Sequence, residues 1–156
     1  MIKVVFICLG NICRSPTAEG IFRKLVNDAG LTNVIEVDSA GTSNCHVGNP
    51  PDNRAIATAK WRGIDMSMFK SRQAGNDDFN QFDYVIAMDH SNHQKLLAMC
   101  PPGNESRLRM CLSFAPSIGL SEVPDPYYED GFETVFDMLE LAGKGLLAEI
   151  RDKYNL

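Results

Sequence analysis

The sequence predicts an α/β fold: a single doubly wound domain in which a four-stranded parallel sheet carries helices on both faces. Short apolar runs alternate with longer amphipathic stretches, a pattern typical of strands buried on both faces and joined by crossover helices. The chain has 156 residues, 44% of them hydrophobic, which is enough to bury one sizeable core but not two. We therefore expect residues 1–156 to form one domain.

Four apolar runs predict the strands of this sheet. The first is interrupted only by Lys3 and stops at Gly10 and Asn11, which favour a turn. The later runs are bounded in the same way by polar residues, glycine or proline. We expect strands over residues 2–8, 34–39, 82–88 and 108–114.

Amphipathic stretches between these runs predict the helices. Pro16 suits a first helical turn because its missing N–H costs nothing there, and apolar residues then recur at helical spacing. Gly63 closes a second helix, and Pro101 requires a third to end before it. The last pattern is the longest and is expected to cover the sheet. The predicted helices span residues 16–30, residues 52–62, a stretch from Ser91 to just before Pro101, and residues 132–154.

The long irregular stretch over residues 115–131 contains three prolines. A loop of that length inside a compact domain is usually functional or mobile. It carries the tetrapeptide Asp125-Pro126-Tyr127-Tyr128. We expect this loop to be free to close over a bound substrate.

The composition excludes several classes of function. Twenty acidic residues against 15 basic ones give a net charge of -5, which argues against a broad basic surface for nucleic acid or anionic lipid. No stretch approaches the roughly 18 apolar residues of a membrane span. Five cysteines without regular spacing indicate free thiols in a reducing compartment. We expect a soluble cytoplasmic protein that binds neither nucleic acid nor membrane; its oligomeric state, monomer or weak dimer, stays open.

The segment CLGNICRSP, from Cys8 to Pro16, joins the first predicted strand to the first predicted helix. In doubly wound folds, ligands bind at the carboxyl ends of strands, where helix N-termini present free N–H groups. Gly10 lets the backbone curl closely and Asn11 tolerates left-handed dihedral angles, so that successive N–H groups can surround one anion. Arg14 adds a planar fork for two phosphate oxygens. The segment therefore predicts a phosphate site.

Cys8 is the candidate nucleophile of this site. It lies at the end of the strand, where the helix N-terminus and Arg14 both favour negative charge, so we expect a thiolate at neutral pH. Such a sulfur can attack phosphorus in line and form a phosphocysteine that water later hydrolyses. Ser15 can donate a hydrogen bond that stabilises the thiolate.

The arrangement Cys-x5-Arg-Ser is the phosphate-binding signature of cysteine-based phosphatases. Here CLGNICRSP resembles the active-site loop of the low-molecular-weight protein tyrosine phosphatases. Further segments resemble that family in the same order along the chain: DSAG at residues 38–41, MDHSN at 88–92, DPYY at 125–128 and FETV at 132–135. The resemblance covers nearly the whole chain.

This resemblance implies hydrolysis of phosphotyrosine in protein substrates, and of other aryl phosphates, with no metal or other cofactor. Cys8 would be the nucleophile, Arg14 the phosphate clamp and Asp125 the general acid that protonates the leaving phenolate. The rest of the substrate site would comprise Leu9, Gly10, Asn11, Ile12, Cys13 and Ser15 in the loop, with Tyr127 and Tyr128 at the rim. The resemblance also implies that Cys13 can form a reversible disulfide with Cys8 under oxidation.

Two segments depart from the family's pattern. Residues Asn44, Cys45 and His46 stand where family members often place an aromatic wall of the substrate pocket. Residues 68–70, Met-Phe-Lys, stand where many members carry a histidine that supports the loop. We expect substrate preference, and the hydrogen bonds behind Asn11, to differ accordingly.

Three other functions stay open. An arsenate reductase of the same fold needs two closely spaced cysteines after the third strand, whereas Cys100 and Cys111 lie further along. A protein arginine phosphatase tends to carry threonine in place of Ile12, whose apolar side chain favours a phenyl ring. A phosphate-binding module without catalysis would not need Cys8 and Asp125 together.

His90 and His93 lie close to Asp89 and could be imagined as metal ligands. Three ligands from one short segment make a weak site, so we expect helix-surface histidines instead. Asp89 is expected to order the phosphate-binding loop or to cap the helix that follows it.

Overall fold

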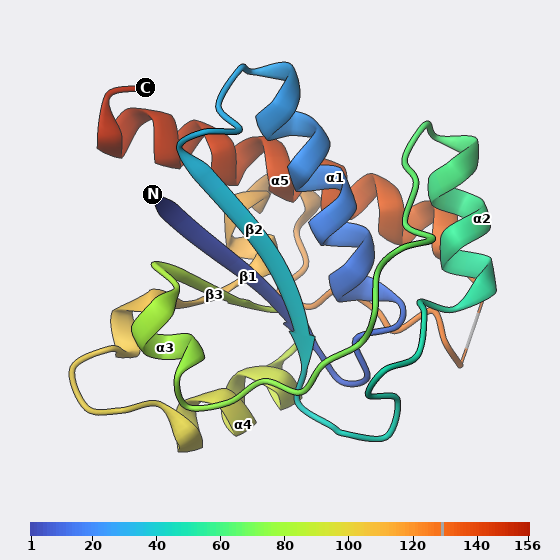
Figure 1. The fold of residues 1–156 in the computed structure, drawn as a ribbon, viewed down its shortest axis with the longest axis horizontal. Coiled ribbons are helices and arrows are strands. Elements are labelled where there is room, and N and C mark those ends of the chain that lie inside the picture. Colours follow the sequence, from blue (N-terminus) through green and yellow to red (C-terminus); the bar gives the residue numbers. More distant parts are fainter. Residues whose placement is uncertain (129) are drawn as a thin grey trace.

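The computed structural model describes residues 1–128 and 130–156 (Figure 1). At its centre lies a sheet of four parallel strands in the order β2-β1-β3-β4. The strands are β1 (Ile2–Cys8), β2 (Ile35–Gly41), β3 (Tyr84–Ala87) and β4 (Leu108–Met110). The predicted fold class is confirmed.

Helices cover both faces of this sheet. In the described residues the α-helices are α1 (Arg14–Asp28), α2 (Asn53–Trp61), α3 (Asp78–Gln81), α4 (His90–Met99) and α5 (Phe132–Tyr154). Figure 1 shows α1 and α5 side by side on one face, with α3 and α4 on the other.

Alternate residues of β1 serve the two faces of the sheet. Val4 and Phe6 join the core beneath α1 and α5, whereas Val5 and Ile7 join the core beneath α3 and α4. Because successive strand side chains point in opposite directions, a strand covered on both sides needs an unbroken apolar run. That is why the first run of the sequence predicts its strand so clearly.

The fourth strand is shorter than the sequence predicts. Instead of running over residues 108–114, it ends at Met110, and residues 111–114 form a 3-10 turn that packs against α5. Cys111 and Leu112 are buried there in the core beneath α1 and α5. A short apolar run is equally compatible with a strand and with a buried turn. The sequence pattern therefore predicts the burial of these residues correctly and the length of the strand wrongly.

Other boundaries differ by a few residues. Helix α1 begins at Arg14 rather than at Pro16, and β2 continues to Gly41. Short 3-10 turns at residues 105–107 and 116–118, like α3, had no clear pattern in the sequence. The second of these turns lies in the long loop over residues 115–131, of which Glu129 lies outside the described residues.

The carboxyl ends of β1 and β3 lead directly into the segments before α1 and α4. The two segments therefore meet at the same edge of the sheet, where a doubly wound fold places its ligands. Among the described helices, none is both long enough and apolar enough to cross a membrane.

Candidate active site

Residues 8–15, between β1 and the first turn of α1, form a tight loop that we call the phosphate loop. The end of β2 lies so close to it that a Cβ atom on Gly41 would come within 2.8 Å of the Leu9 carbonyl oxygen. The Thr42 N–H donates a hydrogen bond to the Cys8 carbonyl oxygen at 2.9 Å. The backbone that follows β2 thus braces the loop, and glycine is needed at the point of closest approach.

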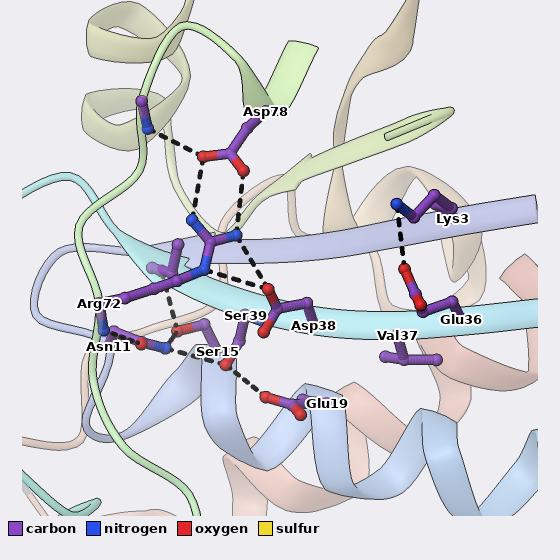
Figure 2. Close-up of polar contacts among 12 residues, drawn as sticks. Lys3, Asn11, Ser15, Glu19, Glu36, Val37, Asp38, Ser39, Arg72 and Asp78 are labelled. Atoms are coloured by element: carbon purple, nitrogen blue, oxygen red, sulfur yellow. Dashed lines mark hydrogen bonds and ion pairs between the residues drawn. The ribbon is translucent and has the colours of Figure 1, made fainter. Parts of the chain in front are cut away.

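Asn11 lies at the centre of the polar contacts behind this loop (Figure 2). Its backbone has a left-handed φ of 57°, as the sequence predicts for this position. Its Nδ2 donates to Ser15 Oγ at 2.8 Å and to Ser39 Oγ at 3.0 Å, and its Oδ1 accepts the Arg72 N–H at 3.1 Å. Ser71 Oγ donates to the Asn11 carbonyl oxygen at 2.8 Å. These bonds hold the left-handed turn in place.

The Arg72 side chain fixes the segment that makes two of those bonds. Figure 2 shows its guanidinium between two carboxylates: Nε donates to Asp38 Oδ2 at 3.0 Å, and Nη2 donates to Asp78 Oδ1 at 3.0 Å. Burial opposes the charge of Arg72, but the two carboxylates outweigh it and raise the pKa of the guanidinium. The bonds join the Arg72 segment to β2 and α3, so the donor to Asn11 has a rigid support.

The Cys8 sulfur lies at the base of the loop, 3.0 Å from Ser15 Oγ. Ser15 is fully buried and has one hydroxyl proton, which it can donate to the sulfur or to the Ala40 carbonyl oxygen 3.2 Å away. A negative charge on the sulfur favours the first choice, because a charged acceptor makes the stronger hydrogen bond. Ser15 therefore lies where the sequence predicts a donor to the thiolate.

Arg14 is buried beside Cys8. Its Nη1 donates to Asp89 Oδ2 at 2.8 Å and to the Val123 carbonyl oxygen at 2.9 Å, and its Nη2 lies 3.5 Å from Asp125 Oδ2. Burial opposes the positive charge, but Cys8 and the two carboxylates outweigh this effect and raise the pKa of Arg14. The guanidinium is thus permanently charged and held by groups from two separate segments, the one after β3 and the long loop.

Asp89 has both of the contacts that the sequence predicts for it. It orients Arg14, and its Oδ1 accepts the Asn92 N–H at 2.7 Å, which caps the N-terminus of α4. The neighbouring His90 is exposed, and its Nε2 lies 3.1 Å from Ser121 Oγ. Within residues 1–128 and 130–156, no three His, Cys, Asp or Glu side chains gather as a metal-binding group.

A pocket of about 220 Å³ opens above the phosphate loop. It is smaller than the roughly 300–1,000 Å³ of pockets for drug-sized ligands, so it suits a phosphate that carries a single ring. The pocket brings together nearly all the candidate residues; it is lined by Cys8, Leu9, Gly10, Ile12, Cys13, Arg14, Ser43, Cys45, His46, Asp125, Tyr127 and Tyr128. Asn11 and Ser15 are the two predicted site residues that do not line the pocket. Both belong to the phosphate loop, and both are buried.

Asp125 enters the pocket from the long loop. Its Oδ1 accepts the Tyr127 N–H at 3.0 Å, and its Oδ2 faces Arg14. The rings of Tyr127 and Tyr128 meet edge to face with centroids 5.0 Å apart, at the rim as predicted. An acid, a cation and a sulfur thus converge on one small cavity.

His46 supplies a further ring to the pocket lining. Its imidazole centroid lies 6.4 Å from that of Tyr127, and both line the pocket. The segment of residues 44–46 therefore does provide a planar wall, although one that is smaller and more polar than a phenyl or indole ring.

A buried carboxylate, Glu19, completes the contacts behind Asn11. Ser39 Oγ donates to Glu19 Oε1 at 2.6 Å, and Arg23 Nε donates to the other carboxylate oxygen at 2.8 Å. Burial raises the pKa of Glu19 despite these bonds. Sequence reasoning missed this residue, yet its spacing of four from Ser15 would place both on one face of a helix.

Comparisons with known proteins agree with this geometry. The family model described as "Low molecular weight phosphotyrosine protein phosphatase" matches residues 3–156. The Bacillus subtilis "Low molecular weight protein-tyrosine-phosphatase YfkJ" is 41% identical over 156 residues, which is 100% of both chains. The crystal structure of YfkJ has a TM-score of 0.95 and covers 98% of this chain and 96% of that chain.

Two other relatives bear on function. The human "Low molecular weight phosphotyrosine protein phosphatase" is 43% identical over 142 residues, 86% of each chain. The crystal structure of DARP, described as a drosophila arginine phosphatase, has a TM-score of 0.89 at 30% identity and covers 96% of this chain and 98% of that chain. With the family model matching from residue 3 to the last residue, this chain belongs to the low molecular weight phosphotyrosine protein phosphatase family.

Proposed function

We propose that this protein hydrolyses phosphotyrosine in protein substrates through a phosphocysteine intermediate on Cys8. One observation carries the proposal: Cys8, Arg14 and Asp125 all line the same small pocket. We also propose that residues 1–156 act as one domain, since both cores pack on a single sheet. The five free thiols favour the cytoplasm as its compartment.

In the first step, the Cys8 sulfur attacks phosphorus as the bond from phosphorus to the phenolic oxygen breaks. Asp125 gives its proton to the departing oxygen, which therefore leaves as a neutral phenol. Arg14 and the N–H groups of the phosphate loop bind the remaining phosphate oxygens, where charge is concentrated in the transition state. Sulfur gains the phosphoryl group and the phenol gains the proton.

In the second step, the Asp125 carboxylate takes a proton from a water molecule whose oxygen attacks phosphorus. The bond from sulfur to phosphorus breaks, and inorganic phosphate leaves. The Ser15 hydroxyl, 3.0 Å from the sulfur, stabilises the thiolate as it departs. The enzyme returns to its starting state with Asp125 protonated.

The pocket walls favour an aromatic leaving group. Ile12 presents an apolar side chain, and Tyr127 and Tyr128 can pack against a phenyl ring. The likeness to DARP makes phosphoarginine the second candidate substrate. Its leaving group is a cationic guanidinium, which would lie against the same walls in place of a phenyl ring. Arsenate reduction is less well supported, because Cys111 is buried and burial raises its pKa to about 12.

Purified protein should hydrolyse p-nitrophenyl phosphate in the presence of a chelator. Cys8→Ser should abolish turnover, whereas Cys100→Ser, a thiol outside the pocket, should not. Asp125→Ala should lower kcat/KM for a phosphotyrosine peptide by about 10²- to 10⁴-fold while inhibition by inorganic phosphate stays unchanged.

Three peptides of identical sequence that carry phosphotyrosine, phosphoserine or phosphoarginine separate the candidate substrates. Preference for phosphotyrosine supports the proposal, and preference for phosphoarginine replaces it by the second candidate. Turnover that survives Cys8→Ser would remove the phosphocysteine mechanism altogether.

We further propose that Cys13 protects Cys8 from irreversible oxidation. Both thiols are free, buried and part of the same pocket lining. Peroxide would oxidise Cys8 to a sulfenic acid, and the Cys13 thiol would then condense with it, forming the disulfide bond and releasing water.

A further inference from the structure

Arg54, in the first turn of α2, lies beside the pocket but takes no part in the chemistry described so far. Its side chain is about half-exposed, at 48%. It forms two parallel hydrogen bonds with Asp52, from Nε to Oδ1 at 3.0 Å and from Nη2 to Oδ2 at 2.9 Å. Such a paired geometry fixes the plane of the guanidinium.

The fixed guanidinium lies against the loop that carries Asp125. Its Nη2 donates to the Tyr127 carbonyl oxygen at 3.3 Å, and its central carbon lies 5.7 Å from the centroid of the Tyr127 ring. It also stacks on Phe132, the first residue of α5, at 4.8 Å. One arginine thus contacts the backbone and the ring of the residue two positions after Asp125.

Asp52, the carboxylate partner of Arg54, is hydrogen-bonded to the phosphate loop. The Asp52 N–H donates to the Ile12 carbonyl oxygen at 2.8 Å. At the far side, the Tyr127 N–H donates to Asp125 Oδ1 at 3.0 Å. A continuous series of contacts therefore runs from Ile12 through Asp52, Arg54 and Tyr127 to Asp125.

The long loop has a separate attachment on the other side of Asp125. Val123 donates its N–H to the Met88 carbonyl oxygen at 2.9 Å and accepts a bond from Arg14. Asp125 is therefore held between two points, one at Val123 and one at Tyr127. At the second point, Arg54 bonds to the Tyr127 carbonyl oxygen and contacts its ring, which also lies against the rings of His46 and Tyr128.

We propose that Arg54 is a positioning residue for the general acid: it joins the Asp125 loop to the phosphate loop and fixes the distance between the proton donor and the leaving oxygen. This inference rests on the proposed function. Proton transfer requires heavy atoms at about 2.6–3.2 Å, and a misplacement of about 1 Å can cost roughly 10²-fold in rate. Hydrogen bonds from Arg54 also lower the pKa of Asp52, so their ion pair persists at mildly acidic pH.

The test compares a poor leaving group, in phenyl phosphate, with a good one, in p-nitrophenyl phosphate. Acid catalysis matters most when the departing oxygen is basic. Arg54→Met should therefore lower kcat/KM for phenyl phosphate by about 10-fold or more and leave that for p-nitrophenyl phosphate within about twofold. Inhibition by inorganic phosphate should not change. Arg54→Lys, which keeps the charge but loses the paired geometry, should lie between wild type and Arg54→Met.

Arg62 offers a matched control at the other end of α2. It too stacks on a ring of α5, Phe136 at 4.4 Å, and pairs with two carboxylates of α5; among the described residues it has no hydrogen bond or ion pair with the Asp125 loop. Arg62→Met should keep the wild-type ratio between the two substrates. An equal loss on both substrates in Arg54→Met, or the same change in Arg62→Met, would overturn the inference.

A double variant distinguishes positioning from a general structural effect. If Arg54 acts only through Asp125, then Arg54→Met should cause no further loss on phenyl phosphate once Asp125→Ala is present. Additive losses contradict the proposal. If wild-type protein shows no turnover that depends on Cys8, the proposed function fails; if turnover depends on Cys8 but the substrate ratio ignores Arg54, only this inference fails.

Discussion

Asn11 shows how much of the site depends on a single residue. A left-handed backbone costs most L-residues about 1–2 kcal/mol, whereas asparagine adopts it readily. Here the side-chain amide also contacts Ser15 and Ser39, so one residue shapes the loop and positions the hydroxyl beside the Cys8 sulfur. The sequence predicts the backbone turn; the partners of the amide come from β2 and from residue 72.

Cys8 and Cys13 lie in the same loop but have different surroundings. Burial, followed by the nearby charges of Asp52, Cys8 and Asp125, raises the pKa of Cys13 to about 12. Cys13 therefore stays protonated at neutral pH and does not compete with Cys8 as a nucleophile. To condense with a sulfenic acid on Cys8, the Cys13 sulfur must lose its proton as it attacks, and that proton leaves with the sulfenic hydroxyl as water.

Limited peroxide should inactivate the wild-type protein reversibly, with activity recovered by dithiothreitol and a peptide linked through Cys8 and Cys13 visible by mass spectrometry. Cys13→Ser should become irreversibly inactive as Cys8 proceeds to sulfinic acid. The exposed pocket thiol Cys45 provides the control, because Cys45→Ser should recover like wild type. Full recovery of Cys13→Ser would show that Cys13 does not protect the site.

Helix α5 passes close to the backbone of another segment at Gly145. At Gly145 an added Cβ atom would collide with the Phe114 carbonyl oxygen in the turn at residues 111–114. At Gly143 an added Cβ would lie 3.0 Å from Leu25 Cδ1, the end of a flexible side chain that can move. A fixed backbone atom therefore limits the space at Gly145, whereas only a movable side chain limits it at Gly143.

Gly145→Ala should destabilise the protein, because about 1–3 kcal/mol of overpacking against backbone exceeds the gain of about 1 kcal/mol in helix propensity. Gly143→Ala, the matched control, should change the free energy of unfolding by less than about 1 kcal/mol, since the two effects offset each other. Urea unfolding of both variants measures this difference. Equal unfolding energies would mean that the turn at residues 111–114 can move away from α5.

In the molecule as a whole, an apolar core lies on either side of the sheet, and the polar site lies at one edge of it, where β1 and β3 end. Most of the molecule's buried polar and charged side chains gather behind that edge, among them Asn11, Arg14, Ser15, Glu19 and Ser39. Glu19 is unusual among them because burial raises the pKa of its carboxyl. The Glu19 carboxyl therefore releases its proton at a higher pH in the folded protein than in the unfolded chain.

This raised pKa makes a contribution to stability that depends on pH. This contribution is fully present below the unfolded pKa of about 4.3. It is lost as pH rises from that value through the higher folded pKa, because in this pH range the native state binds more protons than the unfolded state. Glu19→Gln should remove this contribution, so the stability of the variant relative to wild type should improve as pH rises from about 4 to 7. Thermal unfolding across that range provides the measurement.

The exposed carboxyl of Glu133 serves as the control for this pH dependence. Glu133→Gln, which removes a carboxyl from an exposed site, should differ from wild type by no more than about 0.5 kcal/mol. A relative stability of Glu19→Gln that does not vary with pH would show that Glu19 titrates normally in the folded protein.

The parallel sheet, the four longer helices α1, α2, α4 and α5, and the phosphate loop were all predictable, because each depends on a local pattern of apolar spacing or turn residues. The lengths of β4 and of the turn after it were not, because an apolar run of that length fits a strand and a buried turn equally well. Burial of Cys111 and Leu112 against α5 decided between them.

The sequence by itself determined the fold class and the loop that surrounds a phosphate, since residues 8–16 carry the turn, the sulfur and the guanidinium within one short segment. Only the tertiary structure decided what supports that loop. Glu19 behind Ser39, Arg72 beside Asn11 and Arg54 against Tyr127 join positions 20, 61 and 73 residues apart. Contacts over such separations arise from the packing of whole elements, and no local pattern of residues encodes them.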